Sequence, residues 1–319
     1  MPHGHTIPEK IRRRLGDDKT GRRLQLQEKL KKGKIAQGLG LFALERFLSV
    51  NSCISGIISL CGMRSRGLRN IHDIRIEEHE VILPGLPSAF EGFRLLQLAD
   101  LHCDLEVGIM DRVREVMSAT PHDAVVMTGD YHNEVSMPFD RSLAEMIRLI
   151  PHLHPNRFAI LGNHDFLEMV APLEDVGLPF LLNEALPIER DGTRIWICGV
   201  DDPHFFRTHD LPKTREGIPA GEIAILLSHS PETYREAATH GYHLHLSGHT
   251  HGGQICAPGG IPLYRNAPGC SREHLAGSWR EGSMVGYTSR GTGSAGVAAR
   301  FYCPPEITLH ILRSSNHGN

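Results

Sequence analysis

Five apolar runs in the second part of the chain end directly in side chains that can bind a metal ion. The runs have the length and composition of buried β-strands and cover residues 93–99, 124–128, 157–161, 222–227 and 242–246. Stretches of helical character separate the first three runs, and their polar ends recur about every 30 residues, the length of a βαβ unit. This order of elements predicts an α/β domain.

The polar residues at the strand ends are expected to meet in space. In open α/β sheets, binding sites form at the carboxyl ends of the strands. A single aspartate at such a place is more often a helix cap or a turn residue, but capping does not explain seven residues in register. The predicted metal ligands are Asp100, His102, Asp130, Asn163, His229, His249 and His251.

The last strand end has the sequence SGHTHGGQ, from Ser247 to Gln254. His249 and His251 are one residue apart, so on an extended segment both side chains point to the same side. The flanking glycines let the backbone turn tightly and approach a ligand closely. A lone His-x-His pair could also be two surface histidines in a turn, so its assignment depends on the residues upstream.

The first 70 residues differ in composition from the rest, and we predict an N-terminal extension at residues 1–70 and a domain at residues 71–319. Residues 1–34 carry eleven Lys or Arg against four Asp or Glu. Residues 35–63 are the most apolar stretch of the chain. One face of a helix there would be apolar, with Leu44, Phe47, Leu48, Ile54, Ile58 and Cys61. The pattern predicts an amphipathic helix in peripheral contact with anionic membrane.

Three alternatives remain open for residues 35–63. A spanning helix needs about 20 apolar residues. The uncharged stretch 47–63 has only seventeen residues, and five of them are polar. A secretory signal would need a short basic region and a small-residue cleavage site, which the sequence lacks. The helix could also pack on the protein's own core.

The seven cysteines are scattered along the chain and form no C-x-x-C pair. This usage predicts reduced thiols and a cytoplasmic protein.

Five ordered motifs resemble those of the calcineurin-like metallophosphoesterases. They are Asp100-x-His102, Gly129-Asp130, Gly162-Asn163-His164-Asp165, Ser228-His229 and Gly248-His249-Thr250-His251. The sequences GHTHGGQ, SRGTG at 289–293 and RFYCPPEI at 300–307 are similar to a bacterial, membrane-linked branch. Members of that branch act as phosphodiesterases or as UDP-2,3-diacylglucosamine pyrophosphatase-type enzymes of lipid A biosynthesis.

The resemblance implies a four-layer sandwich, in which two packed β-sheets are flanked by helices, and a centre of two metal ions. By its pattern Asp100, His102 and His251 hold one ion. Asn163, His229 and His249 hold the other, and Asp130 bridges them. The sequence departs from the pattern at His132 and Asn133, where an acidic residue is frequent at the second position. We expect both residues to contact the ligands rather than the metal.

The ligand types indicate the metal and the reaction. Carboxylate, carboxamide and imidazole together suit manganese, iron or zinc, with magnesium disfavoured by the many imidazoles. Two such ions can clamp a phosphate and acidify a water. We expect His164 to donate a proton to the leaving oxygen or to stabilise the phosphate, with Asp165 orienting it. Alternatively His164 is a further metal ligand or a structural residue.

Taken together, the sequence predicts a metal-dependent phosphoesterase that cleaves a phosphodiester or pyrophosphate bond. The membrane-binding extension indicates a lipid-linked substrate such as UDP-2,3-diacylglucosamine, and a place at the inner membrane. One alternative is a phosphodiesterase for soluble nucleotides or nucleic acid, although the acidic catalytic part disfavours nucleic acid. The other is a binding module without catalysis, which the complete ligand set disfavours.

Overall fold

The computed structural model describes residues 7–31, 43–135 and 137–315. The helices are α1 (Glu9–Leu15), α2 (Asp17–Lys31), α3 (Ala43–Leu60), α4 (Arg64–His72), α5 (Ile109–Ser118), α6 (Asp140–Leu149), α7 (Val170–Asp175), α8 (Leu211–Arg215) and α9 (Tyr234–Thr239). The first strands are β1 (Arg75–Leu83), β2 (Arg94–Leu98), β3 (Ala124–Met127), β4 (Arg157–Ala159), β5 (Glu184–Arg190), β6 (Thr193–Gly199) and β7 (Ala224–Leu227). The others are β8 (Leu244–Ser247), β9 (Cys256–Ala257), β10 (Ile261–Pro262), β11 (Gly277–Glu281), β12 (Met284–Thr288) and β13 (Glu306–Ser314).

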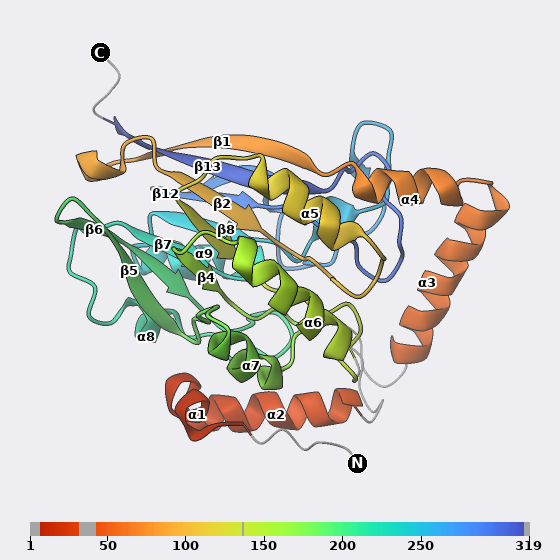
Figure 1. Ribbon diagram of the computed structural model, residues 1–319, viewed down its shortest axis with the longest axis horizontal. Helices are drawn as coiled ribbons and strands as arrows, with labels where there is room; N and C mark the ends of the chain where they lie inside the picture. The colour runs from red at the N-terminus through yellow and green to blue at the C-terminus, as the bar shows by residue number, and fades with distance from the viewer. Residues whose placement is uncertain (1–6, 32–42, 136, 316–319) are drawn as a thin grey trace.

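Most of the strands form two large mixed sheets (Figure 1). The five-stranded sheet has the order β1-β13-β2-β3-β4, with β2, β3 and β4 parallel to one another. The six-stranded sheet has the order β11-β12-β8-β7-β6-β5, with β12, β8, β7 and β6 parallel. The four parallel strands of the six-stranded sheet lie in its interior, as β2 and β3 do in the five-stranded sheet, whereas β4 is an edge strand.

Strands that are buried on both faces explain the continuous apolar runs of the sequence. In β2, Leu95 packs between the two sheets, whereas Leu96 packs under the helices. In β3, Val126 packs between the two sheets and Val125 packs under the helices. Successive side chains of a strand point to opposite faces, so both sets of side chains in these strands are buried. The polar Gln97 in β2 is the exception, and its amide donates to the Thr128 hydroxyl and to the carbonyl of Ser247.

The predicted four-layer sandwich is confirmed. One apolar cluster joins the facing sheets and includes Leu95, Val126, Ile197, Ile225 and Leu246. A second lies between the five-stranded sheet and helices α5, α6 and α7, and a third covers the six-stranded sheet with residues of α8 and α9. Figure 1 shows α5, α6 and α7 side by side over one face of the molecule.

Helices α1 and α2 pack on the sandwich rather than extending away from it. Ile7, Ile11 and Leu15 are buried in the same cluster as α6 and α7. On α2, the guanidinium of Arg23 is fully buried and lies 2.6 Å from the Asp201 carboxylate. Figure 1 shows the two helices running below α7.

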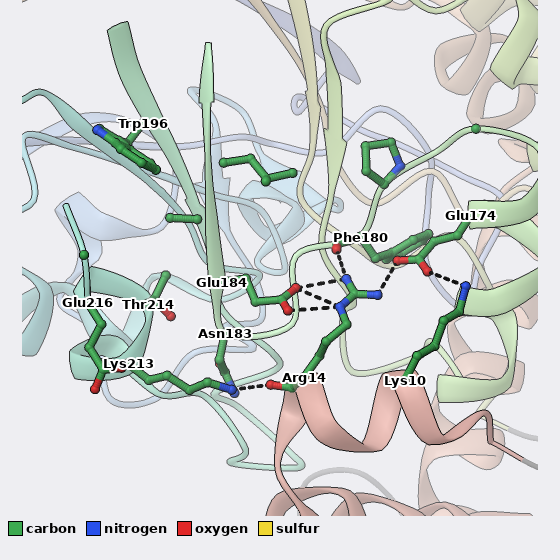
Figure 2. A pocket seen from close by; sticks show the side chains of 15 residues that line it. Lys10, Arg14, Glu174, Phe180, Asn183, Glu184, Trp196, Lys213, Thr214 and Glu216 are labelled. Carbon is green, nitrogen blue, oxygen red and sulfur yellow. Dashed lines mark hydrogen bonds and ion pairs between the residues drawn. The ribbon is translucent and has the colours of Figure 1, made fainter. Parts of the chain in front are cut away.

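Several basic side chains of this segment contact carboxylates of the domain. Arg14 donates to Glu174 and Glu184 at 2.7–3.0 Å, and Lys10 lies 3.5 Å from Glu174. These residues line a cavity of about 840 Å³ between α1 and β5, shown in Figure 2. The positive charge that the sequence analysis assigned to lipid is therefore partly used inside the molecule.

Helices α3 and α4 cover a different part of the surface. Ile54 and Ile58 pack against Val297, Ala299 and Phe301, so for these two residues the alternative of packing on the protein's own core is correct and the predicted lipid contact is wrong. The other part of that helix, residues 35–42, lies outside the described residues, and so do the side chains of 43–50. Among the described helices, none combines the length and apolar character needed to cross a bilayer.

Candidate metal centre

The carboxyl ends of five strands from both sheets meet at one place. Strands β2, β3 and β4 of the first sheet lead into the segments with Asp100, Asp130 and Asn163. Strands β7 and β8 of the second sheet lead into those with His229 and His249. All seven predicted ligands are buried, with exposed fractions of 5% or less. The site lies where the two packed sheets end together.

Asp100, His102 and His251 form one group of potential ligands. One ligand atom from each residue lies within 4.8 Å of the other two. The Nε2 atoms of His102 and His251 are 3.1 Å apart, and Nε2 of His251 lies 4.0 Å from the Asp100 carboxylate. This grouping is the one that the family resemblance implied for the first ion.

Asp130, His229 and His249 form the second group under the same distance criterion. Asn163 adjoins it, because its Oδ1 lies 2.8 Å from Nε2 of His229. Oδ2 of Asp130 lies 3.3 Å from Nε2 of His229 and 3.8 Å from Nε2 of His102. The Asp130 carboxylate is thus located between the two groups, as expected of a bridging ligand.

The backbone at the site is strained. Positive φ angles occur at Asp100 (51°), His102 (41°), Asp130 (58°), His249 (68°) and His251 (51°). Residues other than glycine rarely adopt this region, and each instance costs on the order of 1–3 kcal/mol. Five of the seven predicted ligands carry this cost, which is typical of functional sites held in place by their surroundings.

Two glycines make room for the carboxylates. A Cβ atom at Gly248 would lie 2.5 Å from Oδ2 of Asp100. One at Gly162 would collide with Oδ1 of Asp130. The backbone of these two loops therefore approaches the ligands more closely than any other residue type would allow.

Backbone carbonyls orient two of the imidazoles. Nδ1 of His229 lies 2.8 Å from the carbonyl of Thr128, and Nδ1 of His102 lies 2.9 Å from the carbonyl of His132. In this arrangement Nδ1 carries a hydrogen, and Nε2 points toward the other ligands.

Burial and neighbouring charges shift the pKa values of the ligands. Burial lowers the pKa of His102 to about 4 and raises the pKa of Asp100 to about 7. Burial also opposes a charge on His229, but the Asp130 carboxylate stabilises it, and the pKa of His229 is raised to about 10. In the metal-free protein a proton on His229 thus compensates part of the buried negative charge.

The donor set fits divalent metal ions. Nε2 of His249 is fully buried, and no hydrogen-bond partner for it exists among the described residues. A buried polar atom without a partner is costly, and a metal ion is one partner that would satisfy it. Mixed imidazole, carboxylate and carboxamide ligands in two adjoining groups are suitable for two transition-metal ions.

His164 lies at the edge of this centre. Its side chain is 12% exposed, its Nε2 is 4.0 Å from the Asp130 carboxylate and its Nδ1 donates to the carbonyl of Asn133 at 2.6 Å. Asp165 does not orient His164 as expected. The Asp165 carboxylate instead accepts four backbone N–H groups, from Asp130, Tyr131, His132 and Gly162. A carboxylate surrounded by donors in this way fixes the loops that carry the ligands.

His132 contacts a predicted ligand, as expected, whereas the hydrogen bonds described for Asn133 go to Asp104, His164 and Gly296. The carbonyl of His132 accepts from His102, while the His132 ring lies 2.8 Å from the Ser142 hydroxyl and 3.1 Å from the Asp104 carboxylate. The Asn133 side chain accepts from the backbone N–H of Gly296 at 2.9 Å. The two departures from the family pattern thus link the site to α6 and to the late loops.

Sequence reasoning missed His204 and Glu232. Nδ1 of His204 lies 2.6 Å from the Glu232 carboxylate, and its ring centroid is 4.2 Å from that of His249. The signal that could have revealed His204 is the end of β6, a sixth apolar strand that is followed by Asp201 and Asp202.

Sequence reasoning also missed the contacts of Arg300. The structure buries Arg300 completely, 3.2 Å from Nδ1 of His251, and its other N–H groups donate to loop carbonyls. Nothing in the sequence distinguishes such a buried arginine from an exposed one.

Comparisons with known proteins agree with this geometry. The family model described as calcineurin-like phosphoesterase matches residues 93–253. The chain is 27% identical to the uncharacterized metallophosphoesterases YkuE and YkoQ of Bacillus subtilis, covering 77% and 76% of this chain and 87% and 92% of theirs. It is 29% identical to the phosphodiesterase YaeI of Escherichia coli, over 68% of this chain and 81% of that protein.

Proposed function

The chain belongs to the calcineurin-like phosphoesterase family, and from this premise we propose that it hydrolyses phosphodiester or pyrophosphate bonds at a centre of two metal ions. The observation that carries the proposal is the pair of buried ligand groups that meet at Asp130. A binding module without catalysis would have no need for two complete groups and five strained ligand positions.

Asp100, His102 and His251 would hold one ion, and Asn163, His229 and His249 the other, with Asp130 shared. When bound, the two ions supply an acidified water and neutralise charge on the phosphate, and manganese, iron and zinc suit the ligand set. The protein's part is to keep these side chains in place. Asp165 does so by fixing the loops around Asp130 and Asn163.

His164 is the protein's own candidate for proton transfer. Its ring is fixed through Nδ1 by the carbonyl of Asn133, which leaves Nε2 on the side of the Asp130 carboxylate. A histidine held in this way can donate a proton to the oxygen that leaves phosphorus. Its partial exposure gives a substrate access that the buried ligands lack.

For the substrate we favour a phosphodiester or pyrophosphate in a lipid-linked molecule such as UDP-2,3-diacylglucosamine, at the cytoplasmic side of a membrane. YaeI, a relative named as a phosphodiesterase, supports the bond type. The seven free cysteines are consistent with a reducing compartment. Soluble nucleotides remain the second candidate, since the ligand set itself does not select between them.

The test uses the full chain, stripped of metal with a chelator and refilled with manganese. Hydrolysis of an aryl phosphodiester is compared with that of the matching monoester, and then UDP-2,3-diacylglucosamine with its deacylated analogue. We expect manganese-dependent diester cleavage, which Asn163→Ala abolishes and the exposed control Asn156→Ala retains. Two bound metals without turnover of any of these esters would overturn the proposal.

A further inference from the structure

Apolar side chains are exposed together on one surface beside the metal centre. On α3, Ile57 is 61% and Leu60 is 90% exposed, and they lie on a different side of the helix from Ile54 and Ile58. After β10, Leu263 is 69% exposed and Tyr264 is 70% exposed. Tyr302, in a later loop, is 51% exposed. Exposed apolar groups gathered in this way usually mark a contact surface.

The segments that carry these side chains adjoin one another. The backbone N–H of Cys256 donates to the carbonyl of Phe301 at 2.9 Å, and Phe301 packs in the same cluster as Ile58 of α3. The guanidinium of Arg66 on α4 lies 6.0 Å from the centre of the Tyr302 ring. We call the surface formed by residues 51–72, 255–266 and 295–303 the basic apolar face.

The charge on the basic apolar face has one sign. Its three segments contain no Asp or Glu, and the exposed arginines on it are Arg64, Arg66, Arg69 and Arg265. The structure describes no ion pair for these four side chains among the residues it covers. The whole chain, in contrast, has a net charge of −3. Anionic partners are therefore attracted to this face and repelled by much of the rest.

The same face is joined to the metal ligands. Sγ of Cys303, next to Tyr302, donates to the carbonyl of His251 at 3.2 Å. The side-chain amide of Gln254 donates to the carbonyls of Ala295 and Val297 at 3.1 and 2.9 Å. Asn133, whose carbonyl holds His164, also contacts the backbone N–H of Gly296.

We propose that the basic apolar face docks on an anionic lipid surface and thereby sets the metal centre against the head groups. Exposed aliphatic and tyrosine side chains enter the interfacial region of a bilayer, and arginines beside them bind anionic phosphate. A protein partner is less suited, because the complete lack of acids offers none of the mixed charge pairs that set orientation between proteins. Docking itself requires no catalysis. Only the reason for docking, which is to bring the metal centre to a lipid-linked substrate, rests on the proposed function.

The experiment measures co-sedimentation of the full chain with vesicles of phosphatidylglycerol and phosphatidylcholine, or of phosphatidylcholine alone. We expect binding to the anionic vesicles and at least tenfold weaker binding to the neutral ones. Arg64→Glu with Arg66→Glu should weaken binding more than tenfold, because each arginine near an anionic surface contributes about fivefold. Leu263→Ser with Tyr264→Ser should weaken it severalfold.

Matched controls lie on β5, which Figure 1 shows far from α3. Leu186→Ser and Arg190→Glu remove an exposed apolar side chain and an exposed arginine there, and should bind vesicles as the wild type does. Hydrolysis of a soluble aryl diester, measured in parallel, reports on the proposed function independently of docking. All variants should hydrolyse it like the wild type.

Two results would overturn the inference. One is that the wild type and the variants of the basic apolar face bind anionic vesicles equally well, or that neither binds them. The other is a wild-type dimer in analytical ultracentrifugation that Leu263→Ser with Tyr264→Ser dissociates, since a second copy of the chain would then cover this face.

Discussion

At the scale of single residues, two contacts fix the position of His164: its Nδ1 donates to the carbonyl of Asn133, and its backbone N–H donates to the carboxylate of Asp130. We expect His164→Ala to lower kcat by about 10²–10⁴-fold, the usual contribution of a positioned acid or base. The bound metal should remain, because the ligand groups do not include His164. Steady-state kinetics together with metal analysis test this, with the exposed His152→Ala as control. Full turnover with both metals bound would exclude the acid role.

The buried Asp165 holds backbone loops in place and takes no direct part in the proposed reaction. Asn in its place offers one oxygen and an NH₂ group to the four N–H donors that Asp165 now satisfies. We expect Asp165→Asn to lower the free energy of unfolding by about 2–3 kcal/mol and to weaken metal binding. Urea unfolding and metal titration measure the two effects. The exposed Asp175→Asn should change neither, and an unchanged Asp165→Asn would contradict the role.

The raised pKa values predict that metal binding depends on pH. At pH 6 the metal-free protein holds protons on His229 (pKa about 10) and on Asp100 (pKa about 7). A metal ion requires both groups without their protons, so it must displace them, and its affinity rises as pH increases. We expect manganese to bind at least about a hundredfold more tightly at pH 8 than at pH 6. Calorimetry in buffers of different ionisation enthalpy should show proton release, and a flat profile would refute the assignment.

Residue types and spacing led to seven side chains that the structure brings together, because each lies at or shortly after the end of an apolar strand, and their role as metal ligands stays a prediction. They could not give the contacts of Asp165, His204 or Arg300. Those contacts depend on which loops from different strands meet, for example the residues at 133 and 164 or at 204 and 232. Such pairings arise from tertiary packing and leave no local pattern.

At the scale of elements, α2 is attached to the ligand loop by one buried arginine. Arg23 pairs with Asp201 and donates to the carbonyls of Gly162 and Asp165, at 3.3 and 2.9 Å. We expect Arg23→Ala to lower the free energy of unfolding by about 3–5 kcal/mol, because Asp201 would stay buried without its cation. Chemical denaturation measures this.

A surface pair of the same segment is the control for that prediction. Lys10 is 56% exposed beside Glu174, and exposed pairs contribute about 1 kcal/mol or less. Lys10→Ala should therefore change stability little. If the two substitutions lowered the free energy of unfolding equally, burial of the Arg23–Asp201 pair would add nothing to stability.

The sequence predicted the strands better than the N-terminal helices. Apolar runs of four to seven residues have few alternatives to a buried strand, so β2, β3, β7 and β8 lie where expected. The basic segment was read as lipid-binding because its carboxylate partners, such as Glu174 and Asp201, are more than 150 residues away in the chain. The division at residue 70 remains a prediction.

At the scale of the whole molecule, metal and fold should stabilise one another. The ligands come from both sheets, so an ion that binds them joins the two halves of the sandwich. At a thousandfold excess over Kd, binding contributes about 4 kcal/mol. For a chain of this size we expect the Tm to rise by about 5–10 °C on adding manganese. Calorimetric scans of the wild type and of Asp130→Asn test this, and an equal shift in both would indicate binding elsewhere.

The contact between Arg23 and Asp201 has a consequence for how the chain is made. The two residues are 178 positions apart. A ribosome that adds about 5–20 residues per second needs roughly 10–35 seconds to deliver the second after the first. During most of that interval α1 and α2 are already synthesised, whereas α7, Glu184 and Asp201, on which they dock, are not. The arginine-rich start of a nascent chain is then available to chaperones or to any anionic surface nearby, and its final place is reached only after most of the protein has emerged.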